Sequence, residues 1–221
     1  MHENMQDMLL GFNCIVLVVG NGASGKTSLI KRLMKEDFSE NYVTTPSVTS
    51  FQDFVEHCGR QRALDICFWD TTGADCVKEN TVSYYNNQDA YIIVYDISNE
   101  GSTSQLGPIT KLIEEATQDY PLYEKPPVIL VGNKCDLERK VSKALMQKYA
   151  SEKKIIYFET SAKTGERVPE LREMILEKIE LVISASRRSS DSKLNYALPA
   201  ALEVDRRDRR GCGCGPGCAI M

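Results

Sequence analysis

The stretch GNGASGKT, residues 20–27, decides the fold. It fits the pattern G-x-x-x-x-G-K-S/T, which is typical of loops that bind phosphate groups. The run before it, residues 14–19, is short, apolar and rich in β-branched residues, as expected for a buried strand. The run after it, residues 28–34, repeats apolar residues at helical spacing. Because the loop joins a predicted strand to a predicted helix, we expect it to bind a nucleoside triphosphate rather than to form a simple glycine-rich turn.

Each part of this loop has a chemical role in such a site. Gly20, Gly22 and Gly25 allow the backbone to wrap an anion closely, with its N–H groups pointing inward. The N-terminus of the following helix adds partial positive charge. We expect Lys26 to reach the β- and γ-phosphates and the Thr27 hydroxyl to bind Mg²⁺.

Length and charge limit the remaining possibilities. The 221 residues suit one domain with tails, and no run approaches the roughly 20 apolar residues that span a bilayer. The N-terminus has no basic region followed by an apolar stretch, so we expect no secretory signal and a cytosolic protein. The net charge is −4; the segment from Ser186 onward contributes +3 (seven Lys/Arg against four Asp/Glu), and the rest therefore −7. An acidic body argues against nucleic acid as a partner, and a basic tail favours an anionic membrane.

The pattern of the chain alternates between strands and helices. Strand-like runs cover residues 14–19, 49–56, 63–69, 90–95, 128–131 and 155–159; helical patterns cover residues 27–35, 106–118, 143–153 and 169–183. This alternation predicts an α/β fold, with a mostly parallel sheet covered by helices on both faces and ligands at the carboxyl ends of the strands. We expect an N-terminal extension at residues 1–11, the folded domain at 12–183 and a flexible basic tail at 184–221.

Three further motifs follow predicted strands. In Trp69-Asp70-Thr71-Thr72-Gly73, a carboxylate can hold magnesium-bound water and a glycine N–H can approach a γ-phosphate, although D-x-x-G alone is a weak pattern. In Gly132-Asn133-Lys134-Cys135-Asp136, the last carboxylate can accept two hydrogen bonds from guanine, and adenine has no such donor pair. Thr160-Ser161-Ala162-Lys163 is placed to close over the base. A P-loop kinase or ATPase, which would use adenine nucleotide, is therefore disfavoured.

Taken in this order, the four motifs resemble those of the Ras superfamily of small GTPases. The resemblance covers roughly residues 12–183. It implies the P-loop small GTPase fold, binding of GTP and GDP with Mg²⁺, and switching between two conformations. It also implies an exchange factor, an activating protein and effector proteins as partners, and a monomeric chain.

The resemblance assigns roles to individual residues. The implied phosphate-loop and base-binding residues are Gly20, Gly22, Ala23, Ser24, Gly25, Lys26, Thr27, Ser28, Phe38, Asn133, Lys134, Asp136, Ser161, Ala162 and Lys163. The implied magnesium residues are Thr27, Thr45 and, through water, Asp70; the implied catalytic residues are Lys26, Thr45 and Gly73. For Phe38, which matches an aromatic residue that stacks on guanine, a core aromatic is the alternative.

The chain departs from the family at the position after Gly73. The family has a glutamine there that orients the attacking water, and this chain has Ala74. A methyl group cannot orient water, so we expect slow intrinsic hydrolysis unless a partner supplies its own glutamine. A hydrolysis-deficient, constitutively GTP-bound adaptor is the alternative function. For the subfamily we expect a Rab-like or a Ras-like protein, in that order, because Trp69-Asp70-Thr71 and Tyr84-Tyr85 resemble Rab members.

Three of the eight cysteines lie in the last ten residues. Cys218-Ala219-Ile220-Met221 fits a C-a-a-X box whose terminal methionine favours farnesylation of Cys218. One isoprenoid anchors weakly, so we expect a second signal, palmitoylation of Cys212 and Cys214 being favoured over the nearby arginines. A metal site at Cys-x-Cys is the alternative. We therefore expect the protein on the cytoplasmic face of the plasma membrane or an endomembrane, in vesicle trafficking or signalling, with a cytosolic pool. The five cysteines outside the last ten residues are expected to be reduced thiols: Cys14, Cys58, Cys67, Cys76 and Cys135.

Overall fold

The computed structural model describes residues 12–41, 43–57, 62–73, 83–122 and 124–189. The expected N-terminal extension, Ala74 and the three tail cysteines lie outside these residues. Among the described residues, no helix has the length and apolar character needed to cross a membrane.

A six-stranded sheet forms the centre of the domain, in the order β2-β3-β1-β4-β5-β6. The strands are β1 (Phe12–Val19), β2 (Thr49–His57), β3 (Arg62–Asp70), β4 (Ala90–Asp96), β5 (Val128–Asn133) and β6 (Ile156–Glu159). Only the edge pair β2–β3 is antiparallel, and every other neighbouring pair is parallel. The predicted α/β fold with a mostly parallel sheet is confirmed.

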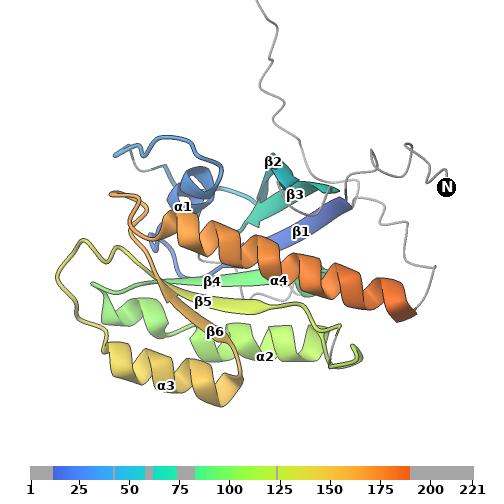
Figure 1. Cartoon of the computed structure of the whole chain (residues 1–221). Helices are drawn as coiled ribbons and strands as arrows, with labels where there is room; N and C mark the ends of the chain where they lie inside the picture. Colours follow the sequence, from blue (N-terminus) through green and yellow to red (C-terminus); the bar gives the residue numbers. More distant parts are fainter. Residues whose placement is uncertain (1–11, 42, 58–61, 74–82, 123, 190–221) are drawn as a thin grey trace, which may run out of the picture.

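Helices cover both faces of the sheet. Helices α1 (Lys26–Leu33) and α4 (Val168–Ser189) lie on one face, and α2 (Leu106–Ala116) and α3 (Lys143–Lys153) lie on the other (Figure 1). A short 3-10 helix, η2 (Glu100–Thr103), follows β4. The alternating side chains of β1 explain its continuous apolar sequence: Val16 and Val18 pack beneath α1 and α4, and Leu17 and Val19 pack towards α2 and α3.

Most of the expected strands and helices are shifted by no more than two residues at either end, and two differences are larger. Helix α4 continues past Ile183, where apolar periodicity stops, to Ser189. Residues 184–189 contain neither glycine nor proline, so the backbone hydrogen bonding of a long helix can continue past the last apolar residues of the sequence pattern. The helix η2 was not expected, because its four residues are too few to show any periodicity.

Candidate nucleotide-binding site

The four motifs meet at one edge of the sheet. Strands β1, β3, β4, β5 and β6 are parallel, so their carboxyl ends lie side by side. Residues 20–27 follow β1, residues 71–73 follow β3, residues 134–136 follow β5 and residues 160–163 follow β6. The tertiary structure therefore brings together segments that are far apart in the sequence, at the edge where such sheets bind ligands.

The phosphate loop depends on glycine at two positions. Gly20 has φ +138°, and a Cβ built on it would lie 2.0 Å from the carbonyl oxygen of Val94. Gly25 has φ +88° and is the N-cap of α1; its Cβ would lie 2.4 Å from Nδ2 of Asn133. Both approaches exclude any side chain. A Cβ on Gly22 would meet nothing within 4 Å, so free space remains beside the middle of the loop.

Lys26 is held inside this loop by backbone carbonyls. Its ammonium donates to the carbonyl oxygens of Gly20 and Asn21, both at 2.9 Å, and the residue is only 6% exposed. The Ser24 hydroxyl donates to the same Asn21 carbonyl at 2.9 Å. A buried ammonium requires such partners. The loop thus holds one positive charge in the segment that the sequence predicts to bind phosphate.

Thr27, Thr45 and Asp70 form a cluster of oxygen atoms. The Thr27 hydroxyl donates to Oδ2 of Asp70 at 2.5 Å, the Thr45 hydroxyl lies 3.4 Å from the same oxygen, and the two hydroxyls are 3.2 Å apart. Asp70 is fully buried, and its Oδ1 has no hydrogen-bond partner among the described residues. Burial raises the pKa of Asp70, against the opposing effects of the Thr27 hydrogen bond and the Lys26 charge.

This donor set fits Mg²⁺. Magnesium prefers oxygen ligands and retains water, and one or two carboxylates are enough to hold it beside phosphates. A buried carboxylate with one unsatisfied oxygen is stabilised by a nearby cation or by water bound to that cation. The three residues that the resemblance named for magnesium are therefore brought together by the fold.

Gly73 lies directly against the phosphate loop. A Cβ on it would lie 2.2 Å from Cα of Gly22, so only glycine can approach this closely. Thr71 fixes the start of the segment, because its backbone N–H and its hydroxyl both donate to the carbonyl of Val18, at 3.3 and 2.9 Å. The end of β3 is thereby attached to β1 at the base of the loop.

The motif of residues 132–136 contains one residue that joins two loops, Asn133, and one whose carboxylate is exposed, Asp136. Asn133 is 1% exposed; its Nδ2 donates to the Ser24 carbonyl at 3.0 Å, and its Oδ1 accepts from the backbone N–H of Ala162 at 3.1 Å. It joins the phosphate loop to the loop after β6. Asp136 is exposed, and one of its carboxylate oxygens accepts from the Ser161 hydroxyl at 2.5 Å. Its orientation is thus fixed while the carboxylate stays accessible to a base.

Phe38 and Lys163 lie at the outer side of the site. Phe38 is half-buried and belongs to neither apolar cluster of the described core, which does not support the core-aromatic alternative. Two residues later, Glu40 forms an ion pair with Lys163 at 3.1 Å. The segment after α1 is thereby brought next to the loop after β6. Ala23, with φ +58°, and Ser28, in the first turn of α1, complete the phosphate-loop segment.

Sequence reasoning missed three residues that hold the site together. Asn21 donates through Nδ2 to the carbonyl of Gly101 at 3.1 Å and so attaches the phosphate loop to η2. Glu159, immediately before the loop 160–163, accepts from Arg139 at 2.9 Å and Lys143 at 3.1 Å. Asp96, at the end of β4, pairs with Lys134 at 2.7 Å. Their positions at strand ends or inside a motif were the only signal available in the sequence.

Comparison with known proteins agrees with this geometry. The Ras family model matches residues 15–181. The chain belongs to the Ras family. This Ras-family chain is 33% identical over 205 residues to the Ras-related protein Rab-13 of Mesocricetus auratus, covering 90% of the chain and 95% of that relative. It is 34% identical over 188 residues to the GTP-binding protein ypt5 of Schizosaccharomyces pombe, covering 84% and 82%. It is 34% identical over 163 residues to the GTP-binding protein drn-1 of Caenorhabditis elegans, covering 73% of each.

Family membership establishes the general chemistry. The chain is a Rab-like small GTPase: it binds GTP and GDP with Mg²⁺ and hydrolyses GTP. The expectation of a Rab-like protein, placed ahead of a Ras-like one, is confirmed at this level.

Proposed function

We propose that this GTPase is a membrane-anchored switch of vesicle trafficking or signalling that recruits effectors in its GTP state and hydrolyses GTP slowly. The observation that carries the proposal is the cluster of Thr27, Thr45 and Asp70. It joins the phosphate loop, the segment between α1 and β2, and the end of β3 at one point. A ligand at this point would therefore bias the positions of all three segments, which is what a nucleotide switch requires.

Each group of residues has a proposed role. The backbone of residues 20–25 and the Lys26 ammonium bind the β- and γ-phosphates, and Thr27, Thr45 and Asp70 hold magnesium, Asp70 through water. When bound, the metal ion neutralises charge on the phosphate oxygens. Gly73 directs its backbone N–H towards the γ-phosphate. The base-contacting residues are Phe38, Lys134, Asp136, Ser161, Ala162 and Lys163, and Asn133 positions their loops.

Hydrolysis requires a water molecule to be oriented in line with the γ-phosphate. Ala74, which lies outside the described residues, has no group that can do this. Lys26, Thr45 and Gly73 remain to stabilise the developing charge. The residues that bind the phosphates are present, and the one that would orient water is missing. We therefore expect tight nucleotide binding and slow hydrolysis.

Single-turnover hydrolysis of bound GTP tests this proposal. Ala74→Gln should raise the rate constant at least about tenfold, because it restores a water-orienting amide. Ala144→Gln, the same substitution at an exposed position of α3, is the matched control and should leave the rate unchanged. Equal rates for wild type and Ala74→Gln, with GTP fully bound in both, would contradict the proposal that Ala74 limits the rate of hydrolysis.

Ala74 also supports a second function, that of a GTP-bound adaptor. If no partner supplies a glutamine, the chain would stay GTP-bound and act as an adaptor that is regulated by exchange, abundance or delivery to the membrane. Chromatography of the nucleotide released from protein purified from its native cells separates the two. Mostly GDP supports the cycling switch, and mostly GTP supports the adaptor.

A further inference from the structure

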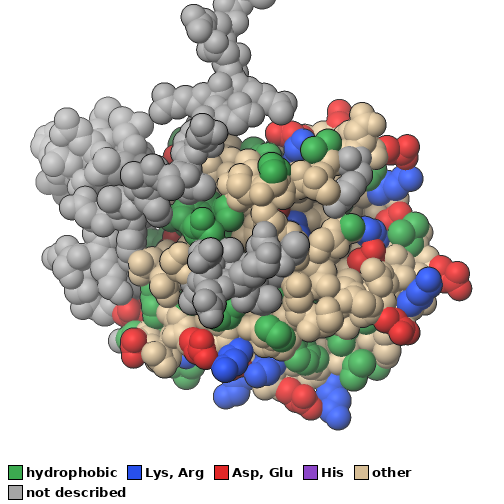
Figure 2. Space-filling model, turned by 180° about the vertical axis from the view of Figure 1, so that it is seen from behind, with side chains coloured by type: hydrophobic (Ala, Val, Ile, Leu, Met, Phe, Trp, Pro, Cys, Tyr) green, Lys and Arg blue, Asp and Glu red, His purple; other side chains and the backbone are tan. Residues whose placement is uncertain are grey.

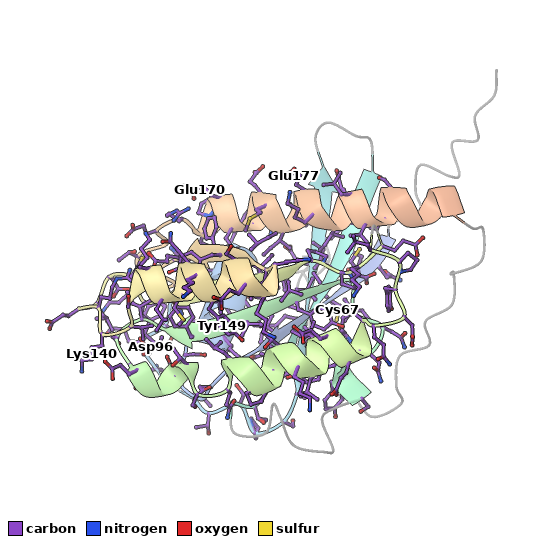
Figure 3. All side chains as sticks on the ribbon, turned by 90° about the horizontal axis from the view of Figure 1, so that it is seen from below. Cys67, Asp96, Lys140, Tyr149, Glu170 and Glu177 are labelled. Atoms are coloured by element: carbon purple, nitrogen blue, oxygen red, sulfur yellow. The ribbon has the colours of Figure 1, made fainter. Side chains whose placement is uncertain are left out.

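Asp96 is a buried carboxylate at the carboxyl end of β4, among the nucleotide-binding segments. Its side chain is 9% exposed. Its Oδ1 accepts from the backbone N–H of Ser98 at 2.8 Å and from the Ser98 hydroxyl at 2.6 Å, and its Oδ2 accepts from Nζ of Lys134 at 2.7 Å. Figure 3 shows Asp96 at the end of the sheet near the loop that carries Lys140. Both carboxylate oxygens are therefore engaged before any nucleotide arrives.

The turn after β4 holds Asp96 rigidly. The Ser102 hydroxyl donates to the Asp96 carbonyl at 2.8 Å and lies 3.0 Å from the Asp96 backbone nitrogen, which donates to it. Burial opposes ionisation of Asp96, but the hydrogen bonds from Lys134 and Ser98 outweigh it and lower the pKa of the carboxyl below its usual range. Asp96 is thus a fixed negative charge.

Lys134 is fixed at both ends. Its backbone, with φ +66°, lies beside Asn133, which pairs with Asp96 in the register of β4 and β5. Its ammonium is held by Asp96, and its Cε lies 4.0 Å from the Cβ position of Gly25. The aliphatic part of the side chain therefore crosses the phosphate loop over Gly25. A lysine that is ordered in advance loses less conformational entropy when a ligand packs against it.

We propose that Asp96 is a positioning residue: it holds Lys134 across the phosphate loop and thereby slows the release of guanine nucleotide. The inference rests on the proposed role of Lys134 in binding nucleotide. As a positioning residue, Asp96 contacts neither the base nor the phosphates of the nucleotide, and it acts only through Lys134. An ion pair that merely stabilised the fold would affect unfolding and leave nucleotide release unchanged.

Release of a fluorescent GDP analogue from the magnesium-loaded full chain measures this role. Asp96→Asn has nearly the same shape but no charge, and it should raise the dissociation rate constant about tenfold. Asp53→Asn is the matched control. Asp53 forms a comparably shielded pair with Arg172 at 2.6 Å, on the part of β2 that pairs with the middle of β3. It should lower the unfolding midpoint without accelerating release.

A double-mutant cycle tests whether Asp96 acts through Lys134. Lys134→Met should itself accelerate release, and adding Asp96→Asn to it should bring no further increase. Acceleration by Asp96→Asn that persists in the Lys134→Met background, or no acceleration in the wild-type background, would overturn the inference.

Ser98→Ala removes one donor to Asp96 but keeps the ion pair between Asp96 and Lys134. It should accelerate nucleotide release a few-fold, and an unchanged release rate would also count against the inference. Failure of the wild-type chain to retain GDP would instead show that the proposed function is wrong.

Discussion

Gly25 shows how a single residue connects the backbone of the phosphate loop to the base motif. It turns the loop into α1 through a left-handed conformation, with φ +88°. Nδ2 of Asn133 lies only 2.4 Å from the position that a Cβ on Gly25 would take. Asn133 cannot move away easily, because it is bonded to the Ser24 carbonyl and the Ala162 N–H. A side chain here would therefore disturb both halves of the site.

Gly25→Ala should lower the free energy of unfolding by about 1–3 kcal/mol, from left-handed strain and the contact with Asn133. It should also weaken GDP binding at least about tenfold, because the Asn133 contacts align both loops. Gly107→Ala is the control: Gly107 is exposed in the first turn of α2, and a Cβ there would meet nothing within 4 Å. Pro108 follows Gly107 and disfavours helical backbone for a residue with a Cβ, which offsets the higher helix propensity of alanine. Gly107→Ala should therefore change the free energy of unfolding by less than about 1 kcal/mol and leave GDP affinity unchanged. Urea unfolding and calorimetry measure both effects; unchanged GDP affinity in Gly25→Ala would contradict the argument.

Among the elements, α4 is attached to α1 and to the edge strand β2 by Arg172. Its guanidinium donates to Oδ2 of Asp53 on β2 at 2.6 Å and to the Leu33 carbonyl at the end of α1. The side chains of Arg172 and Asp53 are 16% and 17% exposed. One side chain thus satisfies a helix C-terminus and a shielded carboxylate of the edge strand.

Arg172→Met keeps the length of the side chain but removes its charge and donors. It should lower the free energy of unfolding by about 2–4 kcal/mol, because Asp53 and the end of α1 lose their partner in a largely shielded place. Combining it with Asp53→Asn should cost less than the sum of the two single changes. Urea denaturation with a common slope gives these values. A loss below about 0.5 kcal/mol for Arg172→Met would show that the bridge does not stabilise the domain.

For the molecule as a whole, membrane contact is proposed to reside in the tail. The body carries −7 and the segment from Ser186 carries +3. On the face shown in Figure 2, basic and acidic side chains of the described residues are interspersed and form no large basic patch. An anionic membrane would therefore attract the tail more than this face. The C-a-a-X motif at Cys218 and the thiols of Cys212 and Cys214 would supply the anchor.

Cys218→Ser should move the protein from the membrane fraction to the soluble fraction of cells, because no isoprenoid can be attached. Met221→Leu is the matched control: it should keep the protein on membranes while exchanging farnesyl for the longer geranylgeranyl group. Fractionation and mass spectrometry of the native C-terminus check both. A wild-type protein with an intact, unmodified Met221 would contradict the lipid anchor.

The sequence predicted the sheet and its helices well, and the reason is physical. Residues 14–19 had to be a continuous apolar run because β1 is covered on both faces, and such a run is visible without neighbours. The helical extension to Ser189 was missed because the sequence of residues 184–189 shows no apolar periodicity. The roles proposed for Ala74 and the tail cysteines stay predictions, since those residues lie outside the described parts of the chain.

By itself, the sequence determined the order of the strands along the chain, the residue types of the four motifs and the position of each motif after a strand. These are local properties, encoded in spacing and side-chain chemistry. Only the tertiary structure decided that Asn133 joins the loops of the site, that Thr27, Thr45 and Asp70 meet, and that Asp96 holds Lys134. Such contacts join residues up to 109 positions apart, and strand order and register alone bring them within hydrogen-bond distance. No local pattern in the sequence carries that information.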